Sequence, residues 1–160
     1  MADPADKVPS AANPAEHAEF ARMSESDLIT HILNSSKTVA IVGLSSNRMR
    51  ASFHVAEYLQ AVGYKIIPVN PHENTVLGEK SYARLQDIPV SIDVVEIFRR
   101  PTFIPEIVEA AIQIEARCVW MQEGIENAKA AERARHAGLL VVMNKCMLKE
   151  RVRRSRAVQR

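Results

Sequence analysis

Five short apolar runs, separated by stretches with helical periodicity, constrain the fold of this 160-residue chain more than any other feature. The runs are rich in β-branched residues and are apolar along most of their length, as strands covered on both faces of a sheet must be. They occupy residues 39–43, 66–69, 94–98, 118–121 and 139–143. This pattern predicts five parallel strands with helices packed on both sides.

Helical patterns fill the intervals between the runs. Ser24 and Asn127 are good N-cap residues, Pro105 suits the first turn of a helix, and Gly138 is a good C-terminal stop. We expect helices over 24–34, from about residue 52 to 62, over 104–112 and over 127–138, and a shorter one over 78–87. Repeated strand and helix units predict a Rossmann-like, doubly wound α/β fold with the five strands in the order 3-2-1-4-5. Trp120, the only tryptophan, is expected in the core.

The chain is long enough for one domain with its own hydrophobic core. We place this domain at residues 24–149. Residues 1–23 lack apolar periodicity and are expected to form a flexible leader. Residues 150–160 are expected to form a solvated basic tail.

Composition excludes several classes of function. The net charge of +2 and the pI near 8.6 are too mild to indicate a nucleic-acid-binding protein. No apolar run is long enough to cross a membrane, and no secretory signal pattern is present. Cys118 and Cys146 have no metal-ligand or redox-motif spacing. We therefore expect a cytoplasmic protein that binds neither nucleic acid nor membrane.

The first apolar run leads into a polar loop and then into a helix. The run ends at Gly43, the loop continues as LSSNR, and the helix pattern begins near Ser52. Backbone N–H groups at a helix start lack partners within the helix, and the helix dipole is positive there. Such a corner holds an anionic group, so the sequence predicts a phosphorylated small molecule as the ligand.

Loops that follow the carboxyl ends of parallel strands share one crevice, which lies where the strand order reverses. By this rule, four loops of the chain place glycines, hydroxyl and amide side chains, and several arginines around the crevice. Their donors and positive charges suit a polyanion. The candidate cofactor-binding residues are Gly43, Ser45, Ser46, Asn47, Arg48, Arg50, Ser52, Asn70, Pro71, Phe98, Arg99, Arg100, Gln122, Glu123 and Gly124.

Each of these segments also has a plain structural explanation. The loop after Gly43 can be a hydrophilic turn, and the Asn70-Pro71 pair can be a proline-braced turn. The Arg99-Arg100 pair can be an ordinary surface feature. From the residues alone, both explanations stay open.

An NAD(P)-dependent or other nucleotide-dependent enzyme is the alternative that the fold suggests. The first loop has one glycine where the GxGxxG fingerprint has three. Asn70 stands where an NAD site carries an acid for the ribose diol, and a neutral amide tolerates a phosphorylated ribose there. Both departures favour a more anionic ligand. No GxSxG or HExxH motif is present and the histidines are scattered, so we predict no catalytic residue and no metal site.

Six ordered segments carry a resemblance to a known family. They are VGLSSN at 42–47, YL at 58–59, GYKIIPVNP at 63–71, DVVEIFRRP at 93–101, WMQEGI at 120–125 and VMNKC at 142–146. With these segments the chain resembles the small stand-alone coenzyme A-binding proteins. Those proteins look like the CoA-binding domain of the succinyl-CoA synthetase alpha subunit.

The resemblance implies that coenzyme A or an acyl-CoA is the ligand. It implies that the 45–47 loop and the helix start at Ser52 hold the CoA phosphates, and that Asn70 and Pro71 flank the adenosine. The loops at 98–101 and 122–124 would then lie along the rest of the ligand. The synthetase also has a domain that carries a phosphorylated histidine, and no sequence remains here to build one. We therefore expect a binding module without catalysis of its own, with a homo-oligomer or a regulatory protein partner left open.

Overall fold

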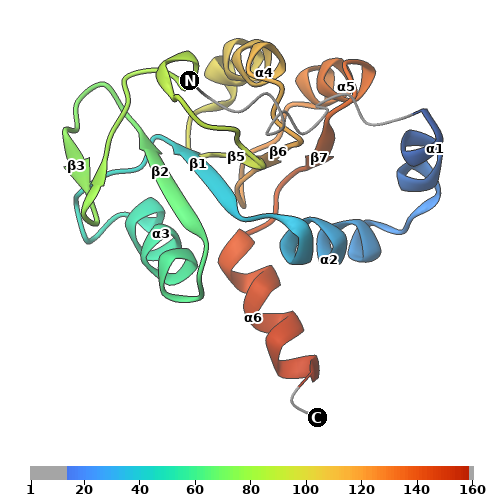
Figure 1. Ribbon diagram of the computed structural model, residues 1–160, viewed down its shortest axis with the longest axis horizontal. Helices are drawn as coiled ribbons and strands as arrows, with labels where there is room; N and C mark the ends of the chain where they lie inside the picture. Colours follow the sequence, from blue (N-terminus) through green and yellow to red (C-terminus); the bar gives the residue numbers. More distant parts are fainter. Residues whose placement is uncertain (1–13, 159–160) are drawn as a thin grey trace, which may run out of the picture.

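The computed structural model describes residues 14–158 and shows a parallel sheet between two layers of helices (Figure 1). The order of its strands is β2-β1-β5-β6-β7. Their bounds are β1 (Thr38–Val42), β2 (Lys65–Val69), β5 (Val94–Ile97), β6 (Cys118–Met121) and β7 (Leu140–Val142). The predicted α/β class, the five parallel strands and the two helical layers are confirmed.

The predicted strand order is wrong. Counted along the five runs, the observed order is 2-1-3-4-5, because β5 pairs with β1 instead of extending the sheet beyond β2. Asp93, directly before β5, ties that strand to the start of β1. Its Oδ2 accepts hydrogen bonds from the N–H of Lys37 (2.7 Å) and of Thr38 (3.1 Å), at the start of β1. The outer edge of β2 is taken by Tyr82, which pairs with Val69.

The segment 78–87, predicted as a short helix, is not one. It contains half of a two-stranded hairpin and a single 3-10 turn, with the bounds β3 (Thr75–Val76), β4 (Glu79–Lys80) and η2 (Leu85–Asp87). Leu77 and Gly78 in the hairpin turn both have positive φ (52° and 77°), as a type I′ turn requires. Tyr82 then donates its N–H to Pro68 O (3.0 Å), so the backbone there is bonded to β2 instead of to a helix.

The other predicted helices are confirmed. They are α2 (Glu25–Ser35), α3 (Ala51–Ala61), α4 (Ile104–Gln113), which follows the 3-10 turn η3 (Pro101–Phe103), and α5 (Ala128–His136). Ser24 caps α2 by accepting a hydrogen bond from Asp27 N–H (3.1 Å). Asn127 caps α5 in the same way through Ala130 N–H (3.0 Å). Gly138, beyond α5, has a φ of 94°, a conformation that glycine adopts without strain.

The two ends differ from the expected leader and tail. Residues 1–13 lie outside the described residues, but α1 (Pro14–Arg22) is a helix within the predicted leader. It buries no residue, and it contacts α2 through the rings of Phe20 and His31, whose centroids are 4.9 Å apart. Most of the predicted tail also belongs to a helix, α6 (Met147–Val158).

Arg154 is the reason that α6 does not behave as a solvated tail. Its guanidinium group donates to the buried carboxylate of Glu150 (2.7 Å), which lies one helical turn earlier. It also donates to Thr30 Oγ1 (2.8 Å) and Ser26 O (2.9 Å) on α2. The basic run is therefore partly used to fasten α6 to the domain. Among residues 14–158, no helix combines the length and apolarity needed to span a membrane.

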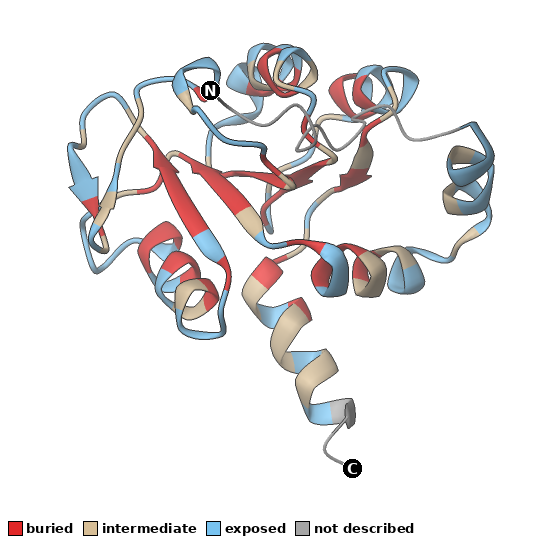
Figure 2. Cartoon of the chain, viewed as in Figure 1, coloured by how far each residue is buried: buried red, intermediate tan, exposed pale blue. Residues whose placement is uncertain are grey.

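The helices divide the core between the two faces of the sheet. α2, α3 and α6 cover one face, and α4, α5 and η2 cover the other (Figure 1). Colouring by burial shows the strands of the five-stranded sheet mostly enclosed between these layers (Figure 2). Trp120 is fully buried, as predicted, and its indole N–H donates to Lys145 O (2.8 Å).

One acid lies inside this core. Glu96 on β5 is fully buried, with Ile41 of β1 and Trp120 of β6 as its neighbours in register. Neither of its carboxyl oxygens has a hydrogen-bond partner among the described residues. Burial disfavours the ionised form and raises the pKa of Glu96 to about 8. The carboxyl group is therefore mostly protonated at neutral pH.

Glu96 should make stability depend on pH. Its pKa is raised from 4.5 to about 8, so between these values the folded state binds more protons than the unfolded chain and stability falls as pH rises. We expect the free energy of unfolding to drop by a few kcal/mol across this interval. Glu96→Gln cannot ionise and should flatten the slope in urea denaturation. Glu57→Gln, on the exposed surface of α3, is the control, and an equally steep slope in Glu96→Gln would contradict the prediction.

Candidate ligand-binding site

β1 and α3 are joined by a tight corner that begins at Gly43. Its φ is 88°, and a β-carbon added there would lie 2.5 Å from the carbonyl oxygen of Phe98. Backbone conformation and sterics therefore both require glycine at this position. Because no side chain intervenes, the loop after β1 lies directly against the loop after β5. Phe98 N–H also donates to Val42 O (2.9 Å).

The loop that follows Gly43 is shaped by its own side chains. Ser45 N–H donates to Ser52 Oγ (3.2 Å), Asn47 N–H to Ser45 Oγ (3.1 Å), and Met49 N–H to Asn47 Oδ1 (2.9 Å). Ser52 is buried and accepts from this loop. The N-cap of α3 is Arg50, whose side chain makes no capping hydrogen bond.

Asn70 ties the turn after β2 to the same corner. Its Nδ2 donates to Leu44 O (3.0 Å), and its Oδ1 accepts from His72 N–H (2.9 Å). Its backbone N–H donates to Tyr82 O (2.9 Å). The side-chain amide of Asn70 thus links the turn after β2 to the loop after β1, and its backbone N–H links the same turn to Tyr82.

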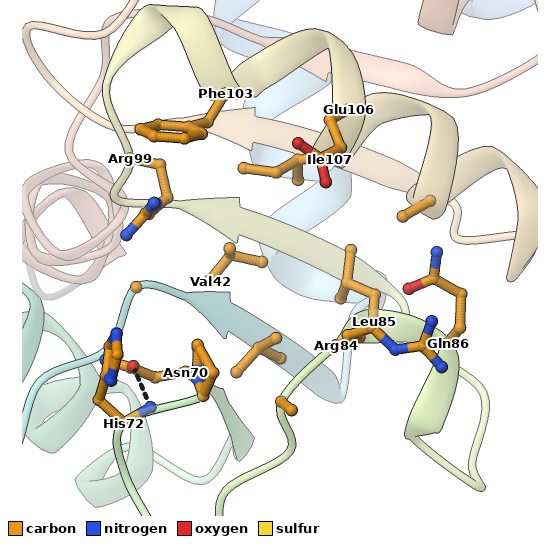
Figure 3. A pocket seen from close by; sticks show the side chains of 15 residues that line it. Val42, Asn70, His72, Arg84, Leu85, Gln86, Arg99, Phe103, Glu106 and Ile107 are labelled. Carbon is orange, nitrogen blue, oxygen red and sulfur yellow. Dashed lines mark hydrogen bonds between the residues drawn. The ribbon is translucent and has the colours of Figure 1, made fainter.

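A cavity of about 410 Å³ opens at this edge of the sheet. It lies between the turn after β2, the η2 segment and the start of α4 (Figure 3). Its volume is in the range of small-molecule sites. Arg99 lies beside the Phe103 ring on one side of the cavity, with Asn70 and His72 across from it (Figure 3). Four of the predicted residues line the cavity, namely Gly43, Asn70, Pro71 and Arg99.

The observed strand order explains where the cavity lies. The order reverses between β1 and β5, and a ligand crevice is expected at such a reversal. Gly43 and Arg99 follow these two strands. The order 3-2-1-4-5 would instead have placed the reversal between β1 and β6, and would have brought the 122–124 loop into the crevice.

The 122–124 loop makes other contacts in the structure. The Glu123 carboxylate pairs with Lys149 Nζ (2.9 Å), and Gly124 N–H donates to Asn144 Oδ1 (2.7 Å). Gln122 is buried, and its Oε1 has no partner among the described residues. The predicted residues that do not line the cavity are Ser45, Ser46, Asn47, Arg48, Arg50, Ser52, Phe98, Arg100, Gln122, Glu123 and Gly124.

Sequence reasoning missed the wall of the cavity that the η2 segment, the end of η3 and the start of α4 provide. Its polar and aromatic members are Arg84, Gln86, Phe103 and Glu106, and His72 joins them from the turn after β2. The helix predicted over 78–87 concealed the first two, and α4 was expected only to pack on the sheet. Two signals could have found them. The Leu77-Gly78 pair indicates a turn, and α4 begins at the same sheet edge as the Arg99 loop.

Two guanidinium groups are the main positive charges of the cavity. Arg84 pairs with Asp87 (3.0 Å), and its hydrogen bonds hold the pKa of Asp87 below the ordinary value. Arg99 lies over the Phe103 ring, 4.2 Å from its centroid. None of the ion pairs found between described residues involves Arg99. Its charge is therefore available to an anionic ligand.

Fold and cavity together define the class of protein, a small Rossmann-like α/β domain with a pocket at the carboxyl edge of its sheet. Within residues 14–158, no three His, Cys, Asp or Glu side chains are grouped to hold a metal ion. The sequence model of the family described as "CoA binding domain" matches residues 37–151. The chain belongs to this family, and the resemblance seen in its sequence is confirmed.

Relatives of this chain include small proteins of similar length. The uncharacterized protein YneT of Bacillus subtilis is 38% identical over 119 residues, which are 74% of this chain and 88% of that protein. A hypothetical protein from Pyrococcus horikoshii has a solved structure with a TM-score of 0.79 and 40% identity, and the match covers 81% of this chain and 92% of that one.

A larger enzyme contains a similar segment. An ADP-forming acetate–CoA ligase of Archaeoglobus fulgidus is 32% identical over 94 residues. These residues are 58% of this chain but 13% of the ligase. The chain is thus similar to a small part of that enzyme.

The close approach at Gly43 can be tested by stability. We expect Gly43→Ala to lower the free energy of unfolding by at least about 3 kcal/mol, because it combines an unfavourable φ with a backbone clash. Gly124→Ala is a matched control, since its φ is 85° and nothing lies within 4 Å of the added β-carbon. It should cost only about 1 kcal/mol. Equal losses for the two variants in urea denaturation would refute the close approach.

Proposed function

We propose that this protein binds coenzyme A or an acyl-CoA at the carboxyl ends of β1, β2 and β5, without catalysing a reaction of its own. Membership of the CoA binding domain family over residues 37–151 is the observation that carries the proposal. The position of the cavity at the reversal of strand order supports it. The residues proposed to contact the ligand are those predicted on the loops after β1, β2 and β5, with Gly43, Asn70, Pro71 and Arg99 at the cavity itself.

The positive charges around the cavity suit a ligand with several phosphate groups. Coenzyme A carries a diphosphate and a further phosphate on its ribose. Arg99 has no competing ion pair among residues 14–158, and Arg48, Arg50 and Arg100 are exposed on the neighbouring loops. Charge-assisted hydrogen bonds from such groups are among the stronger contacts that a phosphate can make. A ligand as long as CoA extends beyond a cavity of about 410 Å³, and we propose that its remainder follows these loops.

A binding role is also consistent with the state of the two cysteines. Burial raises the pKa of the Cys118 thiol well above its ordinary range, which makes it a poor nucleophile. Cys146 is buried as well, and neither residue forms a disulfide. Free thiols fit the cytoplasmic location that we propose. A homo-oligomer or a regulatory protein partner stays a prediction.

Binding can be measured by thermal shift. At about 100 times its dissociation constant, a ligand that binds only the folded state adds about 2.7 kcal/mol to stability. We expect CoA or an acyl-CoA to raise Tm accordingly. If CoA, acetyl-CoA and a long-chain acyl-CoA all leave Tm unchanged, the proposal is wrong. A rise with NAD or NADP but not with CoA would favour the nucleotide-dependent enzyme instead.

The contribution of Arg99 can be separated from that of its neighbour. We expect Arg99→Ala to weaken CoA binding about tenfold and to reduce its salt dependence, because a cation without an ion-pair partner is lost from the cavity. Arg100→Ala removes the same charge from a side chain that does not line the cavity, and should have a smaller effect. The double variant should bind most weakly. Calorimetric titration at two salt concentrations measures these effects, and an unchanged affinity and salt dependence for Arg99→Ala would remove it from the site.

A further inference from the structure

The first loop is linked to the turn after β2 by a carboxylate. Ser46 N–H donates to Glu73 Oε1 (3.0 Å), and the Ser46 hydroxyl donates to the same oxygen (2.8 Å). The neighbouring N–H groups at Ser45 and Asn47 are bonded to side chains within the loop and α3. Ser46 thus gives both of its donors to a side chain 27 residues away in the sequence.

Glu73 contacts the loop in the way that an external anion would. The two hydrogen bonds from Ser46 favour the ionised carboxyl and hold the pKa of Glu73 below its ordinary value. None of the ion pairs found between described residues includes Glu73. A backbone N–H and a hydroxyl just before a helix start are the donors that a phosphate oxygen also uses.

The carboxylate and a ligand phosphate cannot both occupy this position. Ser46 has one backbone hydrogen and one hydroxyl hydrogen, and both are already donated to Glu73. Two negative groups at such short range also repel each other. A phosphate that binds through the donors of Ser46 must therefore displace Glu73.

The structure allows this displacement without unfolding the turn. The turn is held by Asn70, whose Nδ2 donates to Leu44 O (3.0 Å), and by Glu73 N–H, which donates to Asn70 O (3.3 Å). These bonds do not involve the carboxylate of Glu73. The side chain is partly exposed, so it can rotate into water while the backbone stays in place.

We propose that Glu73 is an autoinhibitory side chain that competes with the phosphate groups of the ligand for Ser46. The proposal rests on the proposed function, because it assumes that the loop after β1 receives the phosphates of CoA. In the free protein Glu73 satisfies the donors of the loop and keeps its shape. On binding, Glu73 releases Ser46, and the affinity is lowered by the cost of that release.

Variants at Glu73 test the proposal. We expect Glu73→Ala to tighten CoA binding about five- to tenfold, because the competing charge-assisted hydrogen bonds are lost. Glu73→Gln should give a smaller gain, since its amide oxygen can still accept from Ser46. The affinity for ADP, which carries a diphosphate, should also rise more in Glu73→Ala than in Glu73→Gln. The affinity for adenosine, which has no phosphate, should not change in either variant. Calorimetric titration gives the affinities, and thermal melts establish that each variant is folded.

Glu57→Gln is the matched control for the loss of one negative charge. It lies on the exposed surface of α3, and its affinity for CoA should equal that of the wild type. If the wild type binds CoA and the Glu73 variants bind it equally or more weakly, the competition is disproved while CoA binding stands. If neither the wild type nor any folded variant binds CoA, the proposed function itself fails, and the competition fails with it.

Discussion

The pairing of β5 with β1 is the constraint on which the rest of the structure depends. Asp93 supports this pairing by accepting hydrogen bonds from the N–H groups of Lys37 and Thr38 at the start of β1. Once the two strands lie side by side, the strand order reverses between them, and the loops at their carboxyl ends meet. Gly43 allows that meeting because it leaves room for the carbonyl oxygen of Phe98. The cavity beside these loops follows from the pairing.

Local sequence patterns were sufficient for the five strands and for α2, α3, α4 and α5, but not for the 75–87 segment, the two terminal helices or the order of the strands. The apolar runs mark the strands because burial on both faces demands them, and Ser24 and Asn127 mark helix starts because an unpaired N–H there needs an acceptor. The order depends on bonds such as that of Asp93, whose partners are 55 and 56 residues away. A bond between such distant residues leaves no periodicity along the chain. The same holds for Arg154, since the sequence shows its charge but not its contacts with α2.

The candidate site also contains residues that the sequence predicted and residues that only the structure reveals. Gly43, Asn70 and Arg99 were predictable because they directly follow strands, and strand ends share one edge of the sheet. Arg84 and Phe103 reach the cavity through the packing of η2 and η3, which only the folded chain determines. The link between Ser46 and Glu73 was hidden for the same reason. Ser46 lies on a loop that was predicted to belong to the site, but no local pattern singles out Glu73 as its partner 27 residues away.

The parallel pairing of Tyr82 with Val69 has a consequence for how the molecule meets its neighbours. An exposed sheet edge offers unpaired N–H and C=O groups on which another chain can add a strand. Here Tyr82 satisfies Pro68 O and Asn70 N–H along part of the outer edge of β2. At the opposite edge, β7 spans only Leu140–Val142, and α1 places His17 against Gly138 just before it. Addition of a strand from another chain is therefore disfavoured at both edges of the sheet.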